Sequence, residues 1–175
     1  MDTRFQGTNL CKVDGKGRMS LPAKFRRALI ASDAMCRPGE NPRLFIAYGD
    51  PRQDHVICLS GDAFDALDAR IQAMPDGEEE RELLELLYYS MCDDVQVDEA
   101  GRFVLPGPAR DKLNLDGEAV FQGKGKIFHI LRPEDSDAAK DRVAGMLAKF
   151  GEGKPFFNPI SLANKISDPV NEDAE

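Results

Sequence analysis

Two aspartate–arginine pairs with the same spacing are the side chains in this sequence best suited to binding chemistry. Asp14 and Arg18 stand four positions apart near the N-terminus, and Asp98 and Arg102 repeat that spacing further along the chain. An arginine guanidinium can donate two parallel hydrogen bonds to guanine O6 and N7, and it can also bind phosphate. Each pair can instead form an ion pair that stiffens a tight turn, and for Asp98 and Arg102 we favour that role. The spacing therefore indicates either nucleic-acid recognition or a structural clamp.

The two pairs belong to an internal repeat. Residues 13–29 (VDGKGRMSLPAKFRRAL) align with residues 97–113 (VDEAGRFVLPGPARDKL) at an offset of 84 residues, and eight of 17 positions are identical. In each copy the aspartate can cap a type I turn, and Gly17 or Gly101 tolerates a positive φ before the arginine. Strand-like residues flank both turns, which predicts two hairpins.

Each copy continues in the same way. Pro22 and Pro106 follow a leucine and suit the first turn of a short helix. Arg26 and Arg110 occupy matched positions on these helices and fit internal packing. Aromatic and β-branched residues beyond the helices predict a second hairpin in each copy. Its strands are expected at 43–47 and 55–59 in the first copy, and at 119–122 and 127–131 in the second.

In most of the remaining chain, apolar residues recur at the spacing of a helix. This spacing predicts a helical pair between the two copies and a last helix from Pro133 to Phe150. The apolar stripe of that last helix, formed by Val143, Met146, Leu147 and Phe150, is expected to pack in a core. The predicted organisation is a first repeat at 8–60, a helical connector at 61–91, a second repeat at 92–133, a C-terminal helix at 134–150 and a flexible tail at 151–175.

Charge is divided unevenly along the chain. A net charge of -8 argues against a nucleic-acid partner, because phosphate binding depends on lysine and arginine. Residues 1–30, however, carry seven basic side chains against two acidic ones, a net +5. Residues 61–100 carry 13 acidic side chains against two basic ones, a net -11. Since salt screens charges beyond about 8 Å, a basic face can coexist with an acidic connector.

The basic residues of the first copy predict a DNA contact. A two-stranded hairpin fits the major groove, and Lys16 and Arg18 would project from its rigid tip. The second copy has Glu99 and Ala100 where the first has Gly15 and Lys16. We therefore predict that the first repeat faces DNA and that the second is mainly architectural. The predicted phosphate contacts are Arg4, Lys12, Lys24 and, as the alternative to its packing role, Arg26.

Other functional classes find little support in the sequence. It contains no Ser/His/Asp or Cys/His set, no phosphate-binding Gly-Lys-Ser/Thr loop and no zinc-ligand spacing, and His55 and His129 are far apart in sequence. We predict that the chain is not an enzyme and uses no metal, cofactor or small-molecule substrate. No apolar run approaches the roughly 20 residues of a membrane span, and the N-terminus lacks an apolar leader. We expect a cytoplasmic protein without membrane contact.

The duplicated V-D-x-x-G-R-[apolar]-x-L-P unit, joined by a helical spacer, closely resembles the MraZ family over residues 3–150. The resemblance implies an α+β fold in which two SpoVT-AbrB-like repeats interleave their hairpins into one β-barrel. It places the family's Asp-x-x-x-Arg motif at Asp14 and Arg18, and again at Asp98 and Arg102.

In functional terms, the resemblance implies a nucleoid-associated transcriptional regulator of the division and cell-wall gene cluster. Such a protein would assemble as a ring-shaped homo-oligomer and bind short direct repeats in the double-stranded DNA of the promoter. The alternative that the charge distribution leaves open is an oligomeric protein-interaction module. That module would act through the acidic connector at 61–91 without binding DNA.

Overall fold

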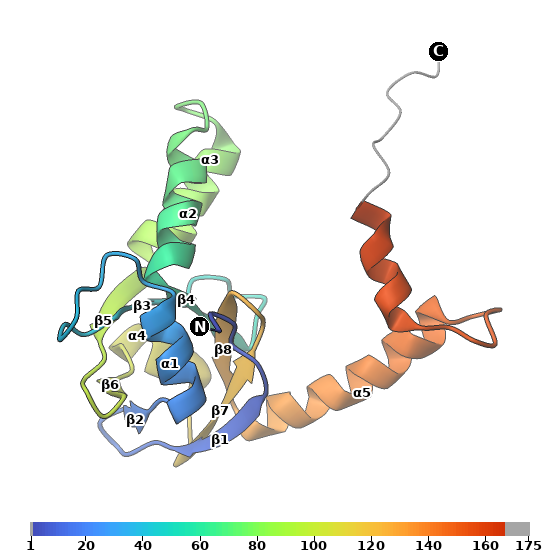
Figure 1. Ribbon diagram of the computed structural model, residues 1–175, viewed down its shortest axis with the longest axis horizontal. Helices are drawn as coiled ribbons and strands as arrows, with labels where there is room; N and C mark the ends of the chain where they lie inside the picture. Colours follow the sequence, from blue (N-terminus) through green and yellow to red (C-terminus); the bar gives the residue numbers. More distant parts are fainter. Residues whose placement is uncertain (1, 167–175) are drawn as a thin grey trace. The chain divides into compact units, whose positions relative to one another are not determined.

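The computed structural model describes residues 2–166, which form two compact units. The first unit ends at Ser136 and the second begins at Asp137. The N-terminal half of the first unit contains four strands and one helix (Figure 1). In order, these are β1 (Thr8–Lys12), β2 (Arg18–Ser20), α1 (Ala23–Ala31), β3 (Arg43–Ala47) and β4 (His55–Ser60).

The C-terminal half repeats that order after a helical connector. The connector consists of α2 (Gly61–Gln72), α3 (Glu79–Glu85) and the π-helical turn η1 (Leu86–Ser90). The elements that follow are β5 (Cys92–Gln96), β6 (Arg102–Val104), α4 (Gly107–Leu113), β7 (Glu118–Gly123), β8 (Ile127–Leu131) and α5 (Pro133–Phe150). The predicted second hairpins are confirmed, because β3 pairs with β4 and β7 pairs with β8 in antiparallel register.

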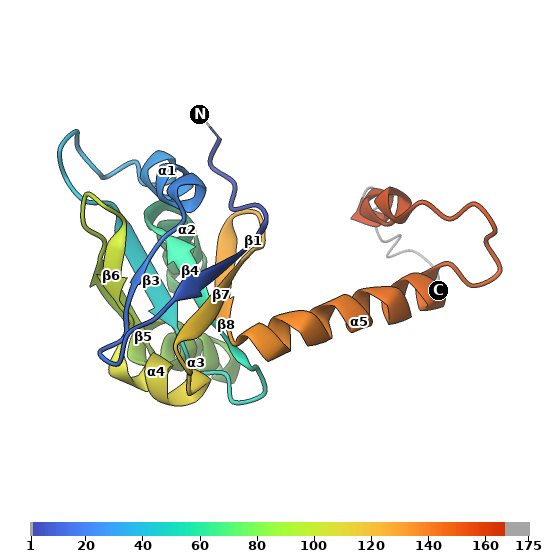
Figure 2. The ribbon, with the colours of Figure 1, turned by 90° about the horizontal axis from the view of Figure 1, so that it is seen from below.

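The strands of the two halves exchange partners. Six strands form one antiparallel sheet in the order β1-β7-β8-β4-β3-β5, and β2 and β6 form a separate two-stranded ribbon. The first half contributes β1 to a pair with β7 of the second, and the second half contributes β5 to a pair with β3 of the first. Figure 2 shows β1 lying along β7. Neither half can therefore complete its sheet alone.

Two predictions about these strands are wrong in part. The fold is α+β, but the sheet is open, with β1 and β5 at its edges, so the strands do not close into a barrel. The predicted first hairpins are also incomplete. The Asp14 backbone N–H donates to the Arg18 oxygen at 3.2 Å and closes the turn, but β1 then continues along β7 while β2 joins β6. Gly17, with a φ of 77°, redirects the chain, and each ribbon strand ends after three residues.

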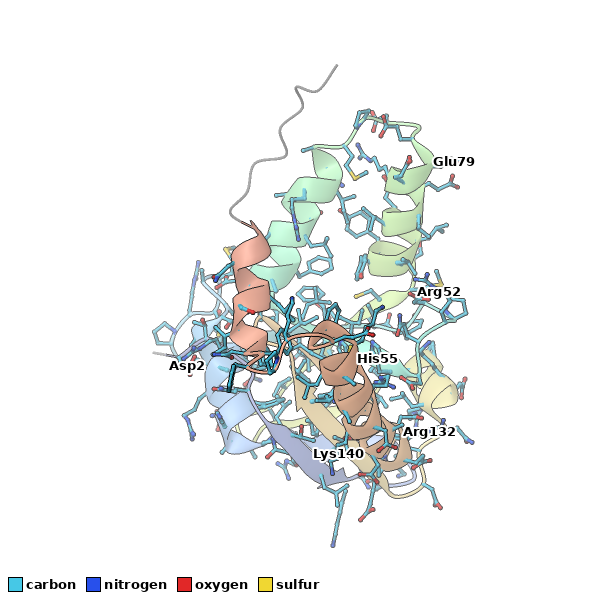
Figure 3. The ribbon with its side chains drawn as sticks, turned by 90° about the vertical axis from the view of Figure 1, so that its right-hand side faces the viewer. Asp2, Arg52, His55, Glu79, Arg132 and Lys140 are labelled. Carbon is cyan, nitrogen blue, oxygen red and sulfur yellow. The ribbon has the colours of Figure 1, made fainter. Side chains whose placement is uncertain are left out.

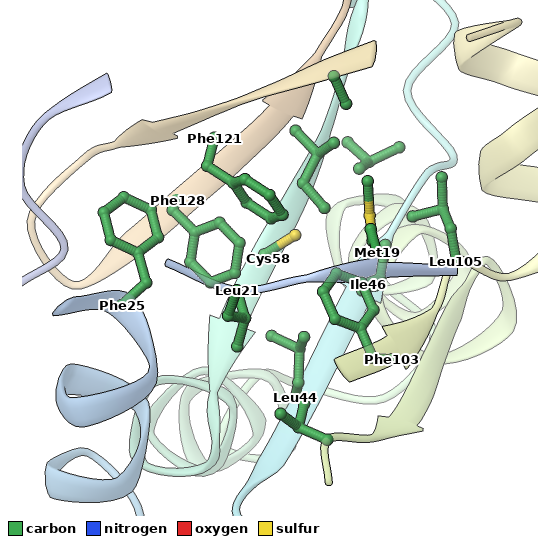
Figure 4. Packing of buried hydrophobic residues seen from close by; sticks show 14 of the residues in the cluster. Met19, Leu21, Phe25, Leu44, Ile46, Cys58, Phe103, Leu105, Phe121 and Phe128 are labelled. Carbon is green, nitrogen blue, oxygen red and sulfur yellow. The ribbon is translucent and has the colours of Figure 1, made fainter. Parts of the chain in front are cut away.

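The hydrophobic core lies between the sheet, the ribbon and the two short helices, α1 and α4. Phe25 of α1 packs edge-on against Phe5 and Phe128, with ring centroids 5.5 and 5.2 Å apart. Met19 and Phe103, one from each ribbon strand, are each 3% exposed and point into the same cluster (Figure 4). Burial of these two side chains attaches the ribbon to the core and leaves its other face outward.

The predicted helical pair is present in the connector. The Ser60 hydroxyl accepts a hydrogen bond from the Ala63 backbone N–H at 3.2 Å and caps the start of α2. The hydroxyl of Tyr89, in η1, donates to Asp68 of α2 at 2.6 Å and joins the two helical segments. Figure 3 shows Glu79 at the outer end of this connector, away from His55 in the sheet.

The last predicted helix is confirmed as α5, which begins in the first unit at Pro133. Its apolar stripe does not form the core that was expected, because Val143, Met146, Leu147 and Phe150 are between 41% and 51% exposed. The helical spacing was right, but such a pattern does not show what covers the apolar face. The predicted tail contains the 3-10 helix η2 (Pro159–Ile166), and its residues 167–175 lie outside the described part of the chain.

Candidate nucleic-acid interface

The first Asp–Arg pair closes a rigid turn. One carboxylate oxygen of Asp14 accepts hydrogen bonds from the backbone N–H groups of Lys16 and Arg18, both at 2.9 Å. The other carboxylate oxygen accepts from the Arg18 guanidinium Nε. The backbone N–H and the guanidinium of Arg18 together hold the pKa of Asp14 below its usual value. Arg18 keeps 62% of its side chain exposed, so a guanidinium oriented by Asp14 still faces solvent.

The second pair has the same geometry. Asp98 accepts hydrogen bonds from the backbone N–H groups of Ala100 at 2.9 Å and Arg102 at 2.8 Å. Its other oxygen accepts from Arg102 Nε at 2.9 Å, and these contacts lower the pKa of Asp98. The ion pair favoured for the second copy is therefore confirmed, and the first copy forms it as well. Because the Arg102 side chain is 70% exposed, an ion pair within the turn is compatible with an outward-facing guanidinium.

Each turn is held in place by the opposite half of the unit. The Leu105 backbone N–H donates to the Gly17 oxygen at 2.8 Å, and the Leu21 N–H donates to the Gly101 oxygen at the same distance. Gly17 has a φ of 77° and Gly101 one of 80°. The side chain of Arg110 packs over Gly17, where it would overlap a Cβ atom. The conformation of the first turn thus depends on residues of the second half.

The ribbon brings the two motif arginines onto one face. In the β2–β6 register, Arg18 lies opposite Val104, and Ser20 lies opposite Arg102. All four residues are exposed, because the side chains that alternate with them point into the core. They line a hollow of about 940 Å³ that both aspartates of the motifs also border. The ribbon is therefore a continuous surface with two oriented guanidinium groups.

The other predicted DNA contacts are distributed around this surface. Lys12, at the end of β1, is exposed and lines the same hollow, and Lys16 is exposed at the tip of the first turn. Lys24 is exposed on α1 and does not border the hollow. Arg4 donates through Nε to Asp2 at 2.9 Å, and its side chain is 69% exposed. The structure therefore groups Lys12 and Lys16 with Arg18, and it places Arg4 and Lys24 elsewhere.

Arg26 has a different environment. It is half-buried, and its Cδ lies 3.2 Å from the position that a Cβ of Gly101 would occupy. Its Nε is buried and has no hydrogen-bond partner within residues 2–166. With Arg37 and Glu99, it borders a separate hollow of about 510 Å³. These contacts match the internal role considered for Arg26 in the sequence.

Ser20 and Val104 belong to the candidate interface and were not predicted from the sequence. They occupy matched positions in the two copies, 84 residues apart. Alternation with the buried residues Met19 and Phe103 would have placed them on the same outward face as the arginines. What the sequence did not show is that the two ribbon strands pair with each other.

Among residues 2–166, no group of three or more histidine, cysteine, aspartate or glutamate side chains is arranged to hold a metal ion. No helix in that range is both long and apolar enough to cross a membrane.

Comparison with known proteins identifies the family. The family model described as "MraZ protein, putative antitoxin-like" matches residues 4–48. A protein of Ruegeria sp. (strain TM1040) named transcriptional regulator MraZ is 45% identical over 162 residues, which is 93% of this chain and 96% of the relative.

Two further relatives carry the same name. The protein of Ruegeria pomeroyi is 43% identical over 160 residues, covering 91% of this chain and 95% of its own. The protein of Cereibacter sphaeroides (strain ATCC 17025 / ATH 2.4.3) is 33% identical over 141 residues, covering 77% of this chain and 83% of its own. Given this identity over nearly its full length, the chain belongs to the MraZ family of transcriptional regulators.

Proposed function

We propose that this chain is a sequence-specific DNA-binding regulator whose DNA contact is the β2–β6 ribbon with its two flanking turns. The observation that carries the proposal is the presence of Arg18 and Arg102 on one exposed face, each oriented by the aspartate of its own turn. The sequence predicted a mainly architectural second repeat. Because Arg102 shares the face of Arg18, we extend the proposed contact to both copies.

The shape of the ribbon supports this proposal. Two paired strands lie about 4.8 Å apart, whereas the major groove is about 12 Å wide. A ribbon with its side chains therefore fits the groove, as two-stranded β-sheet readers do. Arg18 is suited to a bidentate contact with guanine, which is worth about 1–3 kcal/mol of discrimination. The hydrogen bond from Arg18 Nε to Asp14 orients the guanidinium before DNA binds, so less side-chain entropy is lost on binding.

Phosphate contacts would set the register of the ribbon on DNA. Lys12 lines the same hollow as Arg18, and Lys16 belongs to the same turn. We assign them to the phosphates on either side of the groove. Arg4 and Lys24 remain proposed outer phosphate contacts, and Arg26 is assigned to internal packing.

The finer features of the proposal rest on family membership and on the strand exchange. We propose that each half is a SpoVT-AbrB-like unit and that the chain divides at the boundaries predicted from sequence. We further propose a ring-shaped homo-oligomer in the nucleoid that binds short direct repeats in the promoter of the division and cell-wall gene cluster. Several identical ribbons in one assembly would raise the affinity for repeated sites without any new contact.

A gel-shift titration tests this function directly. The probe is a duplex from the promoter of the division cluster, and a scrambled duplex of equal composition serves as its reference. Arg18→Ala should weaken binding to the promoter duplex about tenfold or more, because a bidentate base contact is lost. Arg52→Ala is the matched control, since Arg52 is 81% exposed and pairs with Asp50 at 2.9 Å away from the ribbon. Equal affinities of the parent and Arg18→Ala for the promoter duplex would contradict the proposal.

A second function, protein binding through the connector, has one observation in its favour. Leu83 and Leu86 are 56% and 44% exposed on an acidic helical surface. If the connector binds a protein partner, replacing Leu83 and Leu86 by serine should abolish that binding. Arg18→Ala should leave it unchanged. The DNA-binding function predicts the opposite dependence in the gel-shift assay.

A further inference from the structure

The outer face of the ribbon is chemically asymmetric even though the ribbon is built from two copies of one motif. Each motif arginine has one residue directly across the ribbon from it. That residue is Val104 for Arg18 and Ser20 for Arg102. The asymmetry arises because the repeat has serine in its first copy where it has valine in its second.

Val104 is an apolar side chain at a position where core packing does not require one. It is 51% exposed, while its neighbours Phe103 and Leu105 are 3% and 0% exposed. It also lines the hollow that contains Arg18, Ser20 and Arg102. Single exposed valines are common on protein surfaces, but this one lines the same hollow as both motif arginines and lies directly opposite Arg18 in the ribbon.

We propose that Val104 contacts the methyl group of a thymine next to the guanine bound by Arg18, and that it thereby determines sequence preference at that base pair. The inference rests on the proposed function, because it requires the ribbon to lie in the major groove. Thymine is the base that presents a methyl group there, and apolar side chains recognise it.

The dimensions of the ribbon match this contact. Side chains directly opposite each other in an antiparallel pair have Cβ atoms about 4.5–5.5 Å apart, and successive bases of one strand are about 3.4 Å apart. When Arg18 contacts one base pair, Val104 is therefore within reach of a neighbouring one. At the other end of the same face, the residue opposite Arg102 is Ser20, which offers a hydroxyl and no apolar surface. The two ends of the ribbon would therefore recognise different bases.

The experiment removes the thymine methyl group from the DNA and, separately, changes Val104 in the protein. The probe is a duplex that the full-length parent selects from a randomised pool, remade with each thymine replaced in turn by deoxyuridine, which lacks only the methyl group. Affinities are measured for the parent, Val104→Ser, Val104→Ile and the control Arg52→Ala, which changes an exposed residue outside the ribbon. Thermal unfolding of each variant confirms that it is folded.

For the parent, one deoxyuridine next to a required guanine should weaken binding about three- to fourfold, the ratio that corresponds to one buried methyl group. Val104→Ser should bind the thymine and deoxyuridine probes equally, and Val104→Ile should restore the preference for thymine. Arg52→Ala should keep the preference of the parent. A Val104→Ser variant with the thymine preference of the parent would overturn the inference.

Arg18→Ala in the same assay separates this inference from the proposed function. Loss of binding in Arg18→Ala with an unchanged thymine preference in Val104→Ser would leave DNA binding in place and remove the role of Val104. If Arg18→Ala bound as well as the parent, or if the pool yielded no preferred sequence, the proposed function and the valine contact would both be wrong.

Discussion

The side chain of Arg110, on α4 in the second half of the unit, packs across Gly17 in the turn of the first half. The two halves also share a hydrogen bond at this point, from the Leu105 backbone N–H to the Gly17 oxygen at 2.8 Å. Arg26 makes the corresponding contact with Gly101 in the other turn. Each turn that presents a motif arginine is therefore shaped by the opposite half of the chain.

Replacement of Gly17 in the first turn should destabilise the fold. Gly17→Ala should lower the free energy of unfolding by about 1–3 kcal/mol, because alanine disfavours the positive φ and its Cβ would displace Arg110. Gly77→Ala is the control, since Gly77 has a φ of 82° but no atom within 4 Å of its Cβ position. Urea unfolding should show the larger loss for Gly17→Ala, and equal losses would mean that the contact with Arg110 is unimportant.

Arg110 should act on DNA binding as a positioning residue. Arg110→Ala should weaken binding of the promoter duplex, because the turn that carries Lys16 and Arg18 loses its packing partner. Arg110→Met keeps a side-chain stem of similar length without the charge, so it should restore most of the affinity. Gel-shift titration of both variants gives the answer. If the methionine variant bound as weakly as the alanine variant, Arg110 would act through its charge.

An ion pair with a buried carboxylate joins the loop after α1 to the start of β3. Asp33, with 1% of its side chain exposed, accepts hydrogen bonds from Arg43 Nη2 at 2.8 Å and the Arg43 backbone N–H at 2.9 Å. Asp33→Asn should lower the free energy of unfolding by about 2–3 kcal/mol, since it removes the buried charge of this pair. Asp65→Asn changes a 48% exposed carboxylate on the same guanidinium, and it should cost less than about 1 kcal/mol. Thermal unfolding that gave the two variants the same stability would contradict this account.

Two stacked histidines should lower the stability of the fold in mild acid. His129 stacks on His55, with ring centroids 3.8 Å apart, and burial together with the neighbouring His55 lowers the pKa of His129 from 6.5 to about 4. Lys124 lowers it further, whereas Asp54, beside His55 at 3.4 Å, opposes the shift. Between these pKa values the unfolded chain binds more protons, so the free energy of unfolding should fall as pH drops from about 6.5 to about 4.

The corresponding measurement compares urea midpoints at about pH 7 and about pH 5 for the parent and His129→Gln. The variant should lose less stability than the parent between these pH values, because it lacks the group that takes up the proton. Carboxylates titrate in both proteins and cancel in the comparison. If the two proteins lost the same stability, His129 would not be the group responsible.

Local features of the fold could be predicted from the sequence because their causes are local. The Asp14 turn follows from one carboxylate that caps nearby backbone N–H groups, and α5 follows from apolar residues at helical spacing. The duplication of the motif placed Asp98 and Arg102 in an equivalent turn.

Long-range pairing could not be predicted in the same way. Nothing within residues 8–20 indicates that β1 pairs with β7 and that β2 pairs with β6, because those hydrogen bonds join backbone groups far apart in the chain. His55 and His129 illustrate the same limit, since they are distant in sequence and stacked in the fold. Arg18 and Arg102 share a face because β2 pairs with β6. The two-arginine site could therefore be recognised only in the structure.

A salt titration tests whether the ribbon and its two arginines bind DNA. The affinity of a labelled promoter duplex is measured from low to high salt for the parent, the double variant Arg18→Ala with Arg102→Ala, and the control Arg52→Ala. The affinity of the parent should fall steeply with salt, as it does for proteins that neutralise phosphates. The double variant should bind more weakly at every salt concentration, and the control should follow the parent. An affinity that stays flat with salt, or a double variant that follows the parent, would contradict DNA binding by the ribbon.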